Sequence, residues 1–167
     1  MVPVTISKLK FATLNINCAK RNRSPFELKE DISRFLTTNS IDVLSLTETD
    51  FASIEEANDF KISHYTTFLP VTSNTVEKKV RIITLVDDAL AKHTNLRKDL
   101  MSAPTFPTIW IEINTLKNQK YLLCSTYREW GKDEEKAINR QIIRIEALQE
   151  QLERATLGSH IVVLGGD

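Results

Sequence analysis

The sequence has little of what marks several common classes of protein. Its two cysteines, Cys18 and Cys124, are too few and too far apart for a disulfide framework or a zinc site, which favours a reducing compartment. Its 22 basic and 22 acidic side chains cancel, so no global field attracts nucleic acid or a membrane surface. No apolar run approaches the roughly 18 residues of a membrane span, and no secretory signal follows Met1. We expect an intracellular protein, nuclear or cytoplasmic, with no membrane partner.

What the sequence does contain is enough for one folded domain. Its 167 residues match the usual length of a single domain, and 41% of them are apolar, which is sufficient for a core. Alternating or β-branched apolar runs predict strands over residues 9–17, 43–46, 64–69, 80–86, 108–114, 120–127 and 160–164. The runs at 108–114 and 120–127 are expected to pair as a hairpin.

Two helices are predicted from apolar side chains at helical spacing. The first covers residues 25–39, where Ser24 and Glu27 form a capping box and Pro25 takes the first helical position. The second covers residues 133–155, and its expected buried stripe consists of Ile138, Ile142, Ile145, Leu148 and Leu152. The order of strands and helices predicts an α/β (α+β) domain in which helices cover a sheet.

Polar side chains stand where four of the predicted strands end. Asn15, Glu48, Tyr127 and Asp167 share this placement, and strand ends are where folds of this type collect functional groups. Amide and carboxylate oxygens suit Mg²⁺ or Mn²⁺, and an ion held there can orient a phosphate. Each residue alone also has an ordinary interpretation: a turn asparagine, a solvated glutamate, a packed tyrosine and a solvated terminal aspartate.

Four short stretches, taken in chain order, carry a resemblance to a known family. They are Thr13-Leu-Asn15-Ile-Asn17, Leu46-Thr-Glu48-Thr49, Ser125-Thr-Tyr127-Arg128 and Val163-Leu-Gly-Gly-Asp167. They resemble motifs of the endonuclease/exonuclease/phosphatase superfamily, and are most similar to those of the apurinic-endonuclease-like domain of non-LTR retrotransposons. The resemblance spans Leu9 to Asp167 and implies the αββα four-layer sandwich of that superfamily.

The resemblance also implies a role for each site residue. Asn15 and Glu48 would hold a divalent metal, Mg²⁺ or alternatively Mn²⁺, near the scissile phosphate. Tyr127 would hydrogen-bond or position that phosphate, and Asp167 would orient or deprotonate the attacking water. The implied reaction is metal-dependent hydrolysis of a DNA phosphodiester. In a mobile element the resulting nick primes reverse transcription, so a downstream reverse transcriptase domain is an implied partner.

This sequence departs from the family pattern in several places. Cys18 stands where the first motif usually has glycine, and Thr47 stands where the second usually has glutamine. The asparagine that follows the last motif and the family's C-terminal Asp-His pair are not in the sequence, and none of the three histidines is expected to replace that histidine. We therefore expect residues 1–167 to be a single, incomplete domain, truncated at its C-terminal side, with an incomplete active site. Its second sheet should lack strands, which predicts an open edge, exposed apolar surface and poor solubility.

Basic residues near the motifs are candidates for DNA contacts. Lys20, Arg21 and Arg23 follow the first motif, and Arg128 follows Tyr127. They would bind phosphates, or alternatively form a solvated loop and a helix cap. Two further functions stay open: a phosphatase or lipid phosphodiesterase of the same superfamily, and a non-catalytic remnant that acts only as a binding module.

Overall fold

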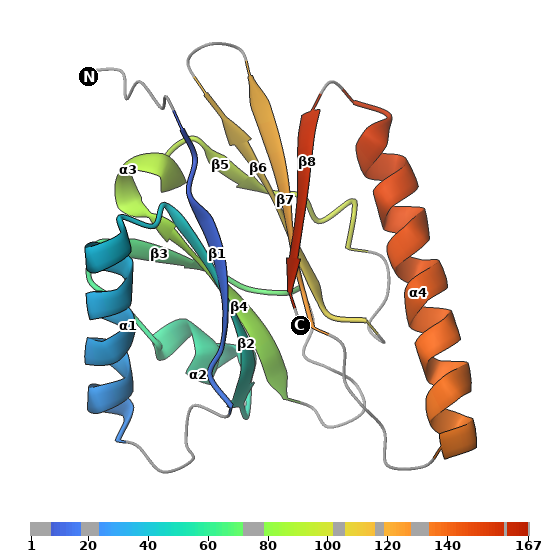
Figure 1. Ribbon diagram of the computed structural model, residues 1–167, viewed down its shortest axis with the longest axis horizontal. Helices are drawn as coiled ribbons and strands as arrows, with labels where there is room; N and C mark the ends of the chain where they lie inside the picture. Colours follow the sequence, from blue (N-terminus) through green and yellow to red (C-terminus); the bar gives the residue numbers. More distant parts are fainter. Residues whose placement is uncertain are drawn as a thin grey trace.

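The computed structural model describes residues 8–17, 24–71, 79–101, 106–115, 119–127, 134–158 and 160–166. Two four-stranded sheets face each other, and helices lie on their outer sides (Figure 1). The elements are β1 (Phe11–Asn15), α1 (Pro25–Asn39), β2 (Val43–Phe51), α2 (Ile54–Asp59), β3 (Tyr65–Phe68), β4 (Val80–Asp87), α3 (Asp88–Ala91), β5 (Thr94–Leu96), β6 (Thr108–Asn114), β7 (Lys120–Thr126), α4 (Glu134–Thr156) and β8 (His160–Gly166). This is the predicted α+β sandwich.

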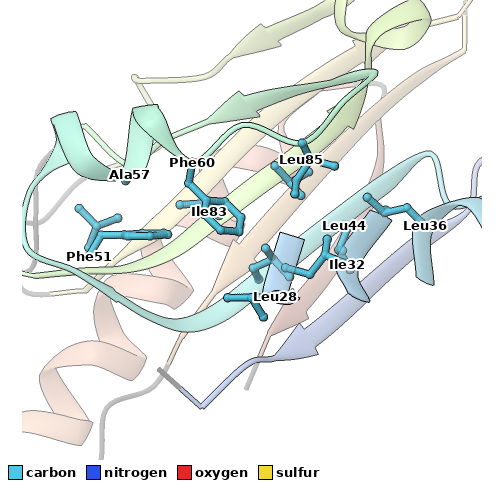
Figure 2. Packing of buried hydrophobic residues seen from close by; sticks show 12 residues of the cluster. Leu28, Ile32, Leu36, Leu44, Phe51, Ala57, Phe60, Ile83 and Leu85 are labelled. Carbon is cyan, nitrogen blue, oxygen red and sulfur yellow. The ribbon is translucent and has the colours of Figure 1, made fainter. Parts of the chain in front are cut away.

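Sheet A has the strand order β1-β2-β4-β3, with β1 parallel to β2 and the other pairs antiparallel. The capping box predicted for α1 is present: the Ser24 hydroxyl accepts from the Glu27 amide, and the Glu27 carboxylate accepts from the Ser24 amide. The helix then places its apolar side chains on the outer face of sheet A. Figure 2 shows this core, which contains Leu28, Ile32, Leu36, Leu44, Phe51, Ala57, Phe60, Ile83 and Leu85.

Sheet B has the strand order β5-β6-β7-β8. β6 and β7 form the predicted antiparallel hairpin, and β8 joins β7 in parallel. A parallel neighbour needs a long crossover, which α4 provides. The C-terminal half of α4 packs on the outer face of this sheet through Leu148, Leu152 and Ala155, against Trp110 and its neighbours.

The predicted buried stripe of α4 is wrong over its N-terminal half. Ile138, Ile142 and Ile145 are 61%, 48% and 57% exposed. The reason is how the helix is turned: its buried face continues toward the N-terminus through Gln151 and Arg144, so the three isoleucines lie on other sides of the helix. Helical spacing identified an apolar face, but the face that the structure buries also carries the polar side chains of Arg144 and Gln151.

The open edge and the exposed apolar surface agree with the sequence-based expectation. On β8 itself, Ile161 is 41% and Leu164 is 46% exposed. Poor solubility stays a prediction. No helix among the described residues is long and apolar enough to cross a membrane. Helix α3 and strand β5 had no counterpart in the sequence analysis, because elements of three or four residues are too short to show a period.

The space between the sheets changes character along its length. Apolar side chains such as Val43, Ile111 and Leu123 fill one part of it. Farther along, the Thr84 hydroxyl of β4 donates to the Ser125 hydroxyl of β7 at 2.8 Å, joining the two sheets through a buried polar contact. The interior thus becomes polar toward the strand ends that carry the predicted site.

Candidate functional site

The ladder between β2 and β4 is interrupted where the second motif lies. It runs regularly to the pair Thr47↔Ile82 and resumes at Phe51↔Val80. Four steps along β2 therefore match two steps along β4, so Glu48 to Asp50 stand opposite Arg81 alone. This is a wide irregularity of the bulge type, and such features re-aim side chains next to active sites.

Two residues of this bulge have a positive φ, a backbone conformation that residues other than glycine rarely adopt. Glu48 has φ 55° and Asp50 has φ 56°, both in the left-handed region. Holding a non-glycine residue there costs on the order of 1–3 kcal/mol, and such residues persist only where surrounding contacts enforce them. The bulge therefore presents Glu48 at a conformational cost, which is typical of functional positions.

Three of the predicted site residues gather at this end of the sandwich. The Tyr127 hydroxyl, just beyond β7, lies 3.5 Å from Oε1 of Glu48 on β2, so the contact crosses from sheet B to sheet A. Its length makes it a weak hydrogen bond. Asn15 ends β1 in register with Thr47, the residue before Glu48, and its Oδ1 accepts from the Asn17 amide at 2.9 Å. An amide oxygen, a carboxylate and a phenol thus share one end of the fold.

An ion pair with β4, the neighbouring strand in the same sheet, supports the bulge. Nη1 of Arg81 bonds Oδ1 of Asp50, and Nζ of Lys79 lies 3.7 Å from the other oxygen. Arg81 and Asp50 are only 13% and 16% exposed. Between the two strained residues, the buried Thr49 hydroxyl donates to the Val80 carbonyl at 2.7 Å. The sequence analysis missed Asp50 and Arg81; the acid two residues after Glu48 was a signal, but nothing in the sequence indicated a bulge.

Buried hydroxyls lie beneath the site. Leu44 and Leu46 point toward α1, so Ser45 and Thr47 face sheet B by strand alternation. Both side chains are buried, and neither hydroxyl has a hydrogen-bond partner among the described residues. Buried polar groups are usually satisfied by protein or water, so this end of the interior fits an ordered water or ligand better than an apolar core does.

Two of the described site residues carry oxygen atoms of the kind that a hard cation binds. Asn15 and Glu48 supply one amide oxygen and one carboxylate, and Mg²⁺ is typically held by one or two carboxylates while it keeps several waters. No cluster of three His, Cys, Asp or Glu side chains that could hold a metal occurs within the described ranges. A fully chelated site, such as structural zinc, is therefore not formed by this part of the chain.

Several predicted residues lie outside the part of the chain that the structure describes. They are the DNA-contact candidates Lys20, Arg21, Arg23 and Arg128, the catalytic candidate Asp167, and Cys18. Their roles stay predictions.

His160 lies away from the site, in line with the expectation that none of the three histidines replaces the family's histidine. Its Nε2 is 2.9 Å from Oε2 of Glu112, and it pairs with Lys120 at the start of β7, whereas Tyr127 follows the end of that strand. Burial would raise the pKa of the Glu112 carboxyl, but hydrogen bonds from His160 and Arg97 outweigh burial and lower that pKa. This network braces the outer face of sheet B and does not belong to the candidate site.

Solved structures share this fold. The structure of D. rerio TDP2 complexed with single strand DNA product has a TM-score of 0.65 at 12% identity and covers 96% of this chain and 60% of its own. The Bacteroides thetaiotaomicron VPI-5482 mannosyl-6-phosphatase Bt3783 has a TM-score of 0.63 at 12% identity, with 96% and 65% covered. An endonuclease/exonuclease/phosphatase family protein from Bacteroides thetaiotaomicron has 0.66 at 12% identity, with 95% and 62% covered.

These comparisons show that the chain has the endonuclease/exonuclease/phosphatase fold. At 12% identity they show the fold alone, and this chain spans 60–65% of the length of those structures. No family model matches the sequence, and no curated protein matches it.

Proposed function

We propose that this chain carries the metal-binding part of a phosphodiester hydrolase that nicks DNA, of the kind found in non-LTR retroelements. The observation that supports it best is the bulge of β2, which presents the Glu48 carboxylate 3.5 Å from the Tyr127 hydroxyl, beside the end of β1. Asn15, Glu48 and Tyr127 come from three separate motifs, and a phosphate bound there would need both a cation and a hydrogen-bond donor.

In this proposal each side chain does what its chemistry allows. The Glu48 carboxylate and the Asn15 amide oxygen would hold Mg²⁺ or Mn²⁺, which supplies Lewis-acid stabilisation of a phosphoryl oxygen when bound. The Tyr127 hydroxyl would donate to a non-bridging oxygen and orient the phosphate. Asp167 would orient or deprotonate the attacking water, as the resemblance implies. Lys20, Arg21, Arg23 and Arg128 would bind the DNA backbone.

Two alternatives are tested by the same assays. The fold is shared with a mannosyl-6-phosphatase, which supports the phosphomonoesterase alternative. It is also shared with TDP2 complexed with a DNA product, which supports a nucleic-acid substrate. A non-catalytic remnant would bind DNA without cleaving it. The reverse transcriptase partner is proposed on the resemblance alone.

A plasmid-nicking assay tests the proposal directly. The proposal is supported if the wild-type chain with Mg²⁺ converts supercoiled plasmid to the nicked form and Glu48→Gln lowers that rate on the order of a hundredfold or more, because the variant loses charge at the cation. Glu112→Gln is the matched control: it neutralises another partly buried glutamate, on the outer face of sheet B, and should leave nicking unchanged.

The outcomes separate the alternatives. Hydrolysis of a phosphomonoester by the wild type, with no nicking, would favour the phosphatase. DNA retained in a mobility-shift assay with no nicking by any variant would favour the remnant. Equal losses in Glu48→Gln and Glu112→Gln would contradict the assignment of Glu48.

A further inference from the structure

The strained backbone of the β2 bulge must be stabilised by side-chain contacts, and contacts around Arg81 of β4 provide that stabilisation. Glu48 and Asp50 both have positive φ, and only Thr49 separates them. An unconstrained strand would relax both residues to extended geometry and restore the regular ladder, which would turn the Glu48 side chain by changing its register. The conformation therefore depends on contacts made by the residues around Glu48.

Those contacts converge on one short segment of β4. Thr49 bonds the carbonyl of Val80, while Asp50 pairs with Arg81 and Lys79 on either side of Val80. Arg81 is also the one β4 residue that faces the whole three-residue bulge in the register of the ladder. Both members of the Asp50–Arg81 pair are mostly buried, so water screens their attraction less than it would at the surface.

We infer that the Asp50–Arg81 pair is a positioning device for Glu48: it holds the strained bulge and so directs the Glu48 carboxylate toward Tyr127. Neither Asp50 nor Arg81 touches substrate in this inference; both act through the backbone of residues 48–50. The inference rests on the proposed function for what Glu48 does, but the device itself is a property of the backbone and is testable without any activity.

A set of three substitutions at Asp50 separates a backbone role from a charge role. Asp50→Ala, Asp50→Asn and Asp50→Gly all remove the same negative charge. They differ in how easily they adopt a φ of 56°: glycine does so freely, asparagine tolerates it, and alanine resists it. A positioning device predicts the order Gly, Asn, Ala from least to most impaired, whereas a charge that acts on metal or DNA predicts equal loss in all three.

Mn²⁺ binding, measured by electron paramagnetic resonance without DNA, is the first readout. Asp50→Ala should weaken Mn²⁺ binding and lower kcat for nicking about tenfold, in the range typical of residues that orient a metal ligand. Asp50→Gly should recover most of both losses, because glycine adopts the positive φ freely. KM for plasmid should not change. A raised KM in Arg81→Ala would show that the guanidinium binds DNA directly and would overturn the inference.

Urea unfolding without metal or DNA is the second readout, and it keeps the inference separate from the proposed function. The unfolding midpoint should fall most for Asp50→Ala and least for Asp50→Gly, although glycine adds entropy to the unfolded chain. Arg81→Ala should lower the midpoint in the wild-type background and much less in the Asp50→Gly background. Equal midpoints for the three Asp50 variants would refute the device. An inactive wild type with the expected order would refute only the proposed function.

Discussion

Helices α1 and α4 are the two long helices in the described part of the chain, and they differ in how much of their apolar surface is covered. Along α1, Leu28, Ile32 and Leu36 are all buried against sheet A. Along α4, Leu148, Leu152 and Ala155 pack in such a core, whereas Ile138, Ile142 and Ile145 are exposed. Both stretches show apolar residues at helical spacing, so the pattern alone does not reveal which of them is buried. What decides it is which face of each helix turns toward its sheet, because α4 turns Arg144 and Gln151 inward.

Two isoleucines turn this comparison into a measurement. Ile32 of α1 is 1% exposed and Ile142 of α4 is 48% exposed. Ile32→Ala should lower the free energy of unfolding by about 2–5 kcal/mol, because it leaves a cavity in a packed core. Ile142→Ala should change it by no more than about 0.5 kcal/mol. Urea denaturation of the two variants, matched in chemistry, gives both values.

Equal losses in the two variants would contradict this comparison. They would mean that the apolar face of α4 is covered in solution, for example by a second copy. Sedimentation of the same samples would then show association.

Helix α4 is also attached to sheet B by the hydrogen bonds of a buried glutamine, which we call the polar anchor. Gln151 is fully buried, and its Oε1 accepts from the Thr108 hydroxyl at 2.9 Å and from the Trp110 indole N–H at 2.7 Å. Gln151→Leu keeps the side chain's bulk but leaves both donors buried without an acceptor. The expected loss is about 1–3 kcal/mol in the free energy of unfolding, measured by urea denaturation.

The double variant Gln151→Leu/Thr108→Val provides the control for that loss. It removes one of the two stranded donors, so it should recover part of the stability. If the double variant is less stable than Gln151→Leu, packing rather than hydrogen bonding accounts for the effect.

Local signals allowed the regular parts of the fold to be predicted. The start of α1 was predictable because Ser24 and Glu27 cap the helix through contacts three residues apart. The hairpin of β6 and β7 was predictable because two alternating runs follow one another closely. In both cases the interacting residues are near one another in the chain, so the sequence pattern contains the interaction.

The bulge and the cover of α4 could not be predicted, because both depend on distant partners. The conformation of Asp50 depends on Arg81, which lies 31 residues away on a different strand. The exposure of Ile142 depends on which face of α4 meets sheet B, and that face carries Arg144 and Gln151. The resemblance to known motifs indicated Asn15, Glu48 and Tyr127, but the strain at Glu48 is visible only in the backbone geometry.

A charged network on the outer face of sheet B gives the smallest expected effect. Nη1 of Arg97 and Nε2 of His160 both lie 2.9 Å from Oε2 of Glu112, and together they hold the pKa of Glu112 below its ordinary value of 4.5. A carboxyl with a lowered pKa in the folded state stabilises that state above the ordinary value. The stabilisation is lost as the pH falls from 4.5 through the lowered pKa.

Glu112→Gln should therefore flatten the fall in stability below pH 4.5, while changing stability at neutral pH by less than about 1 kcal/mol, because Arg97 is partly solvated. Thermal unfolding at a series of pH values measures the slope. Asp99→Asn is the matched variant, because the hydrogen bond from Arg97 also lowers the pKa of Asp99. A slope unchanged in both variants would mean that Arg97 does not stabilise these carboxylates, which would leave Gln151 as the polar anchor of the outer face of sheet B.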